Sequence, residues 1–419
     1  MSTDVGRVLT RALALGFFVF AVAPLSAQLP EKPVPVPGSY DGGYLVFQSA
    51  DGAFKYWVDG RLQVDGAAYW GGENAMGDGT EIRRARLGVK TLLYHNWYAE
   101  IDVDFASNLV EIKDAWVGYT GFRNTLIKAG NYKAPFSLET LTSSKNITFM
   151  ERSYADNFSL DRLIGAGVSH WGKQWQVSAG AFGQAAGTID ATARSEGYGF
   201  AGRATVAPVL GDRKVLHLGF ALGTHTPDAA AGADTNTVRF RARPETYVSK
   251  VRYLSTGKIR LADHTNYVNV EAALVLGSFS LQGEYSQVDV SRLNNLATAS
   301  FNGGYVFASF FLTGDTRVYL ADQGEFDRIV PRKSGGAWEL ALRYSTMDLN
   351  DTNPDVNILG GSADNYTVGL NWYINTNFKW MLNYTRVIND EYAKPDFGIP
   401  PLVAGDKFNM LQTRVSLAF

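Results

Sequence analysis

The chain has 419 residues with a formal charge of −2; 13% of the residues are aromatic and 19% are charged, and there are 43 Gly and no Cys. This composition favours an all-β protein over a helical one, and the absence of thiols excludes a disulfide scaffold and a cysteine metal site. A net charge so close to zero gives no indication of nucleic-acid binding.

Residues 1–27 are typical of a secretory signal peptide. Arg7 and Arg11 precede the apolar run 12–23, and a cleavage site follows at Ala27. A single membrane anchor is the alternative, but the run is well short of the about 20 residues that cross a bilayer as a helix. We therefore expect export from the cytoplasm, followed by a Pro-rich, extended periplasmic segment over residues 28–50.

From residue 51 to residue 419, apolar and polar side chains alternate with a period of two, as they do in β-strands. Segments 97–105, 338–345 and 366–373 show the pattern clearly. In the final segment, one face is formed by Leu411, Thr413, Val415, Leu417 and Phe419. Each strand is thus predicted to have one apolar face and one ionic face.

Three features favour a transmembrane barrel over a soluble sandwich. The alternation ends in Phe419, as it commonly does in outer-membrane barrels, and aromatic residues crowd strand ends at 94–98, 170–175 and 377–384. Connections also alternate between short and long, as expected for periplasmic turns and external loops. Long polar links are predicted near 71–79, 135–160, 186–195, 225–265, 350–362 and 389–404.

The alternating segments between about Phe54 and Phe419 number sixteen, with fourteen and eighteen as alternatives. We therefore predict an antiparallel transmembrane β-barrel over residues 51–419, in the bacterial outer membrane and in contact with its lipid and lipopolysaccharide. A barrel of sixteen strands encloses an aqueous lumen, whereas one of eight strands is filled by its own side chains. The predicted object is a pore.

Several motifs resemble the phosphate-selective porin O and P family. They are "IRRARLG" (82–88), "VEIKDA" (110–115), "PFSLE" (135–139), "TSS" (142–144) and "ERS" (151–153), and the similarity continues in the same order over nearly the whole mature chain. The resemblance implies a passive channel for phosphate or related oxyanions, without catalysis. It also implies homotrimers and a third external loop that folds inward and narrows the channel.

The segment 125–153 is the candidate constriction. After Pro135 it becomes a long run of hydroxyl residues and cations, too polar for lipid and too long for a turn. From the residues alone, a constriction and a mobile surface loop are equally supported, and the resemblance favours the constriction. Closely spaced cations and hydroxyls replace the hydration that an anion loses in a narrow pore.

Strand parity and the resemblance together define the candidate anion-binding residues. Parity places Arg61, Arg84 and Arg86 inside the barrel, whereas Arg83 points outward unless the strand bulges there. The binding residues implied by the resemblance are Arg61, Arg83, Arg84, Ser143, Ser144 and Lys145. Three further positions carry cations where the best-known phosphate-specific member has a tyrosine, an aspartate and a tyrosine: Arg86, Lys113 and Lys133.

Alternatives remain open at this point. Pairing of the arginines with acids such as Glu100, Asp102 and Asp104 predicts a general porin for small polar solutes, and loops that plug the barrel predict an adhesive or structural protein. For the basic loop 238–260, three roles are predicted as alternatives: it draws anions to the mouth of the channel, it binds lipopolysaccharide phosphates, or it is a solvated surface without a specific role. The link 315–333 folds back under the barrel or is a disordered turn. We expect no metal, cofactor or nucleic acid, since no ligand spacing is present.

Overall fold

The computed structural model describes residues 39–41, 44–187, 194–230 and 236–419. The predicted signal peptide, residues 1–27, lies outside these residues, as does most of the Pro-rich segment 28–50. None of the helices in the described part of the chain is long and apolar enough to cross a membrane.

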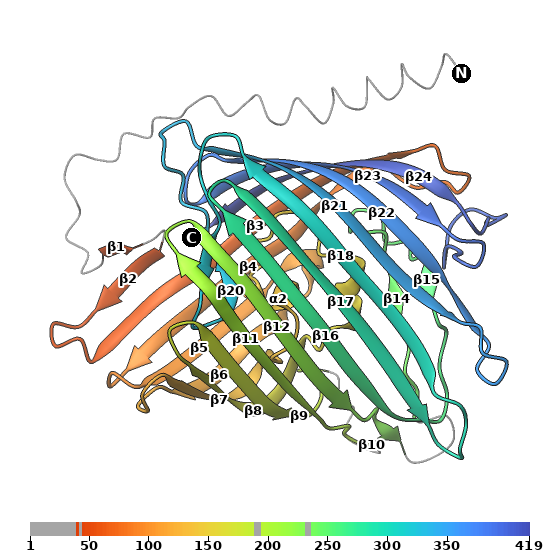
Figure 1. Cartoon of the computed structure of the whole chain (residues 1–419), viewed down its shortest axis with the longest axis horizontal. Coiled ribbons are helices and arrows are strands. Elements are labelled where there is room, and N and C mark those ends of the chain that lie inside the picture. Colours follow the sequence, from red (N-terminus) through yellow and green to blue (C-terminus); the bar gives the residue numbers. More distant parts are fainter. Residues whose placement is uncertain (1–38, 42–43, 188–193, 231–235) are drawn as a thin grey trace.

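Sixteen antiparallel strands close into a barrel, which confirms the predicted fold class and strand number (Figure 1). Each strand pairs with the next along the chain, and the last pairs with the first, from Ala418↔Arg61 to Asn409↔Trp70. The strands are β3 (Phe54–Trp70), β4 (Gly79–Leu93), β5 (Trp97–Asp104), β6 (Glu111–Tyr119), β7 (Thr125–Lys133), β8 (Arg162–Trp171), β9 (Trp175–Phe182), β11 (Gly199–Gly211), β12 (Lys214–His225), β16 (Ala262–Leu276), β17 (Phe279–Arg292), β18 (Ala299–Phe311), β21 (Ala337–Asp351), β22 (Ile358–Tyr373), β23 (Phe378–Asn389) and β24 (Lys407–Ala418).

The outer face of the barrel is apolar and the inner face is polar. In β22, Tyr366 and Val368 are 51% and 43% exposed, whereas Asn365 and Asn371 are fully buried in the lumen. Leu87 and Val89 of β4 likewise face outward. This inverted arrangement confirms the predicted period of two and suits a wall with lipid outside and water inside.

Part of the segment predicted as an extended linker is instead β-structure. β1 (Ser39–Asp41) and β2 (Tyr44–Gln48) form a hairpin, and β2 pairs with the start of β3 from Leu45↔Val58 to Gln48↔Lys55. β24 and the adjoining Phe419 reach β3 only as far as Gly60. The first residues of β3 would therefore present an unpaired edge, which β2 covers.

The connections differ in length at the two ends of the barrel, as predicted. Tight turns join β4 to β5, β8 to β9, β16 to β17 and β22 to β23, and the pattern failed to single out a further one at Asp212 and Arg213. Long connections at the opposite end span 134–161, 183–198, 226–261 and 390–406. Short elements within the connections are η1 (Ala106–Asn108), β10 (Arg194–Ser195) and β13 (Ala229–Ala230).

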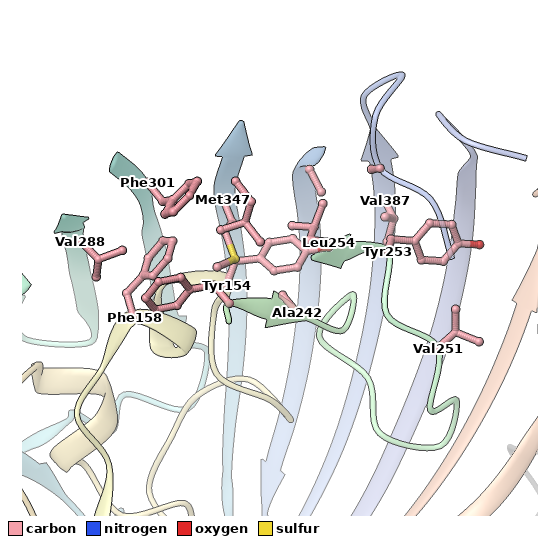
Figure 2. Packing of buried hydrophobic residues seen from close by; sticks show 14 of the residues in the cluster. Tyr154, Phe158, Ala242, Val251, Tyr253, Leu254, Val288, Phe301, Met347 and Val387 are labelled. Atoms are coloured by element: carbon pink, nitrogen blue, oxygen red, sulfur yellow. The ribbon is translucent and has the colours of Figure 1, made fainter. Parts of the chain in front are cut away.

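The loop 134–161 lies inside the barrel and not on its surface. It carries α2 (Leu138–Leu141) and η2 (Tyr154–Phe158), and Phe136, Leu138 and Phe158 are fully buried. Tyr154 and Phe158 pack against Leu254, Phe301 and Met347, which come from loop 226–261 and from barrel strands (Figure 2). The predicted inward-folded loop is thus confirmed, and an apolar cluster holds it there.

Loop 226–261 also lies over the lumen. Its short strands β14 (Arg241–Ala242) and β15 (Leu254–Ser255) pair with each other and contribute Ala242 and Leu254 to the cluster of Figure 2. Because both loops share one apolar cluster, they form a single inward assembly at the external end.

The periplasmic connection 312–336 also enters the lumen, although the sequence predicts that it folds under the barrel or is disordered. It forms a hairpin of β19 (Val318–Leu320) and β20 (Glu325–Asp327). The Tyr319 hydroxyl lies 2.7 Å from His217 Nδ1 of β12, and Arg203 Nη2 of β11 donates to the Gly324 carbonyl at 2.7 Å. Polar side chains of the wall thus form hydrogen bonds with the hairpin inside the barrel.

If this connection folds under the barrel, the sequence predicts that its basic residues extend a cationic exit path from the lumen, and the structure does not place them along the main cavity. Four basic residues were its candidates, and none of them lines the main cavity: Arg317, Arg328, Arg332 and Lys333. Arg317 is buried, with its guanidinium 3.6 Å from the ring centroid of Phe326. The guanidinium is thus packed against an aromatic ring and does not reach the cavity.

Candidate functional site

A cavity of about 1230 Å³ lies inside the barrel between the wall from β3 to β9 and the inward loops. All nine candidate residues line this cavity, although they come from four strands and one loop: Arg61, Arg83, Arg84, Arg86, Lys113, Lys133, Ser143, Ser144 and Lys145. Segments that are distant in sequence therefore meet in a single water-accessible space.

A bulge in β4 turns two consecutive arginines toward the lumen. Gln63 of β3 pairs with Arg84 and Val64 pairs with Ile82, so Arg83 is the extra residue. This is the bulge that the sequence requires if Arg83 is to face inward. Arg83 lies with its guanidinium 3.4 Å from the ring centroid of Tyr247. Arg84 Nη1 donates to Gln63 Oε1 at 2.8 Å.

The inward loop meets the wall at Arg61. Arg61 Nη1 donates to Ser144 Oγ at 2.8 Å and approaches Ser143 Oγ at 3.5 Å. Lys145 Nζ donates to both carboxylate oxygens of Asp59 at 2.8 Å. Burial lowers the pKa of Lys145 to about 8, although the nearby Asp59 carboxylate opposes the shift. A guanidinium, two hydroxyls and an ammonium thus converge at one point of the channel.

The three remaining candidates are less free to meet a solute. Arg86 Nε donates to Asp104 Oδ2 at 2.7 Å. Lys113 is the extra residue of a bulge in β6 and pairs with Glu111. Lys133 Nζ donates to backbone carbonyls of the inward loop, including that of Leu141 at 3.0 Å. Lys133 therefore tethers the loop to the end of β7.

The cavity is also lined by cations that are not among the nine candidate residues. Lys128 Nζ lies 4.9 Å from the Trp116 ring centroid and 4.7 Å from that of Tyr132. Strand parity was enough to place Lys128 inside, since Ile127 faces outward at 43% exposure. At the mouth, the cavity is lined by four cations of the basic loop: Arg241, Arg243, Lys250 and Arg252.

Acids balance most of this positive charge. The cavity is lined by fifteen Lys or Arg and thirteen Asp or Glu residues. Among the described residues, no group of three or more His, Cys, Asp or Glu is arranged to hold a metal ion. The site is thus a polar passage whose selectivity depends on how its charges pair.

Sequence comparison identifies relatives over nearly the full length. The model of the family described as "Phosphate-selective porin O and P" matches residues 57–419. An uncharacterized protein of Caulobacter vibrioides is 32% identical over 93% of this chain and 79% of its own length. Porin O of Pseudomonas aeruginosa is 26% identical over 91% of this chain and 95% of its own length.

Solved porin structures share the fold. An anion-selective porin from Comamonas acidovorans superimposes with a TM-score of 0.54 at 15% identity, over 87% of this chain and 100% of its own. The trimer form of OmpT from Vibrio cholerae gives a TM-score of 0.53 at 12% identity, over 88% of this chain and 100% of its own. The barrel, its aqueous cavity and the family match describe a channel of the bacterial outer membrane. The chain belongs to the phosphate-selective porin O and P family.

Proposed function

We propose that this porin passes phosphate and related oxyanions by passive diffusion, with Arg61, Arg84, Ser143, Ser144 and Lys145 forming the anion site. The observation that carries the proposal is that loop donors and wall donors converge at Arg61. Two donors there are left over, because the buried Arg61 Nε and Arg84 Nε have no hydrogen-bond partner. A tetrahedral oxyanion supplies several acceptors at once, and Arg61 and Arg84 line the cavity in which it would meet them.

A general porin for small polar solutes is the second candidate. The near balance of cations and acids along the cavity favours it, because paired charges cancel much of the potential that would repel cations. The two candidates differ in how phosphate affects other ions. A selective channel carries chloride current that phosphate blocks, whereas a general porin carries both ions and is not blocked.

Block by phosphate tests the site directly. We expect Arg84→Ala and Lys145→Ala each to raise the half-blocking phosphate concentration in planar bilayers by about tenfold, the effect of losing one charge-assisted hydrogen bond. Arg239→Ala is the matched control, because Arg239 is an exposed cation outside the cavity that donates to Ser255 Oγ. An unchanged block in both site variants would show that the anion site lies elsewhere.

We also propose a homotrimer that packs through the wall at β5 and β6. These strands have only 8 and 9 residues, so at a tilt of about 45° they rise about 19–21 Å, less than the about 25 Å of an apolar band. The loop that joins them carries Phe105 and Val110, which are exposed by 49% and 74% and do not line the cavity. Irregular backbone at membrane depth is tolerated only where protein covers it, and a second copy supplies that cover.

Two further assignments belong to this proposal. Residues 1–27 act as a cleaved signal peptide, for which the mass of the mature protein is the test. The basic loop 238–260 recruits anions, since four of its cations line the mouth of the cavity. Contact of this loop with lipopolysaccharide phosphates stays a prediction.

A further inference from the structure

We propose that Glu151 is a built-in counter-anion: its carboxylate occupies the position between Arg83 and Arg84 that a solute oxyanion would take. By occupying this position, the Glu151 carboxylate lowers the affinity of the channel for its anionic solute. This inference rests on the proposed anion function and concerns a residue that the candidate set does not contain. Glu151 lies in the inward loop, is 5% exposed and lines the cavity.

Three guanidinium groups converge on this one carboxylate. Arg83 Nε and Nη2 donate to Glu151 Oε1 and Oε2 at 2.8 and 2.9 Å. Arg414 Nη2 donates to Oε1 at 2.6 Å, and Arg84 Nη2 lies 3.8 Å from Oε2. Two parallel bonds from one guanidinium to two oxygens are the geometry with which arginine also binds phosphate. The carboxylate thus meets the same donors that a solute would use.

The three arginines depend on Glu151 to different extents. Arg414 has a second carboxylate, because its Nε and Nη2 donate to Asp65 Oδ1 and Oδ2 at 2.7 and 2.6 Å. Among the described residues, Glu151 is the one carboxylate within 4.0 Å of either Arg83 or Arg84. Neutralising Glu151 therefore releases two guanidinium groups toward the cavity and leaves Arg414 paired.

Arg61 of the neighbouring anion site is less fully neutralised. Its nearest acids, Asp102 and Asp59, lie 3.5 and 3.9 Å away from Nη2, beyond hydrogen-bond distance. The channel thus has one position closed by its own anion and another that remains open to a solute. With one position closed, a permeating oxyanion is held by fewer cations and leaves more readily, as conduction requires.

The test is Glu151→Gln, which keeps the shape of the side chain and removes its charge. We expect phosphate to block chloride current at an about tenfold lower concentration than in the wild type. Asp156→Asn is the matched control, because Asp156 lies in the same loop, lines the cavity and pairs with Arg152 and not with Arg83 or Arg84. We expect phosphate to block the chloride current of this control variant at the same concentration as in the wild type.

A double variant guards against loss of folding. The double variant Arg83→Gln with Glu151→Gln has the wild-type net charge, and it lacks the Arg83 guanidinium that Glu151→Gln alone would free. The half-blocking phosphate concentration should therefore return to within about twofold of the wild-type value. Should Glu151→Gln fail to assemble, Glu151→Asp serves in its place, since its shorter carboxylate loosens the pair and should tighten block by about threefold. Unchanged or weaker block in the assembled single variant, whichever is used, overturns the inference. If the wild type itself shows no anion preference and no block, the proposed function fails instead.

Discussion

At the scale of single residues, the constriction depends on cations that sit close to their own counter-ions. Lys145 is the clearest case, because its ammonium is buried in the lumen and held by Asp59. Burial disfavours the charged form, and the carboxylate offsets only part of this cost, so the pKa of Lys145 falls to about 8. The charge of the site therefore changes within an accessible range of pH.

This shift predicts a pH dependence of ion selectivity. Below about pH 8 Lys145 is protonated and attracts anions; as the pH rises through about 8 it loses its proton, and preference for chloride over potassium should decline. The measurement is the zero-current potential in a KCl gradient at pH 6.5 and at pH 9.5.

Lys145→Arg is the control for this prediction. An arginine stays charged throughout the range, so the decline should disappear. Burial also raises the pKa of Glu139 to about 8, but Glu139 does not line the cavity. A decline that persists in Lys145→Arg would assign the titration to a group other than Lys145.

At the scale of elements, the lumen is shaped by segments that enter it from both ends. The loop 134–161 and the hairpin β19–β20 meet there, since Leu138 of α2 packs with Phe326 of β20 and with Val215 and Val275 of the wall. This contact fills the side of the barrel formed by β11 to β17. The open path is consequently confined to the opposite wall, where the candidate residues lie.

Shortening the hairpin should widen the path. Replacement of residues 316–330 by a short Gly-Ser turn removes the support of α2, and we expect single-channel conductance to rise on the order of twofold with a weaker phosphate block. Deleting residues 294–295 from the external turn between β17 and β18 is the control, because these residues belong neither to the lining of the cavity nor to the apolar cluster of the inward loops. Equal conductance in the wild type and the hairpin variant would mean that the hairpin does not limit the path.

The sequence predicts local features well and contacts between distant segments poorly. Period two is a local property, so it correctly places Arg61, Arg84 and Arg86 inside the barrel. The bulge at Arg83 depends on the register with Gln63, which no local pattern contains. The contacts of Glu151 join a loop to β4 and β24, and parity says nothing of a loop residue. The position of the hairpin in the lumen is likewise not predictable from a local pattern, because its partners Arg203 and His217 lie on other strands.

At the scale of the whole molecule, the barrel has an uneven wall. β5, β6, β7 and β9 have 8 or 9 residues, whereas β21 and β22 have 15 and 16. Figure 1 shows the short strands grouped on one side of the barrel. A low wall is hard to accommodate in lipid and easy to cover with a second barrel, which links the fold to its proposed assembly.

Charge at the low wall should therefore prevent assembly. We expect Val110→Asp to abolish the slowly migrating trimer on native gels of unboiled protein, because an unpaired carboxylate would be buried between copies. Ile399→Asp is the control, since Ile399 is 76% exposed in the external loop 390–406, away from the low wall. A Val110→Asp protein that migrates like the wild type before and after boiling would exclude this surface as the interface.

The proposed function as a whole depends on a passage that admits anions in preference to cations despite its many acids. The zero-current potential of single wild-type channels in a neutral KCl gradient measures this directly. We predict a potential of the sign set by chloride, because fifteen cations and thirteen acids line the cavity and because Arg61 has its nearest carboxylates at 3.5 and 3.9 Å, beyond hydrogen-bond distance. A potential near zero, or one of the sign set by potassium, would contradict the proposed function.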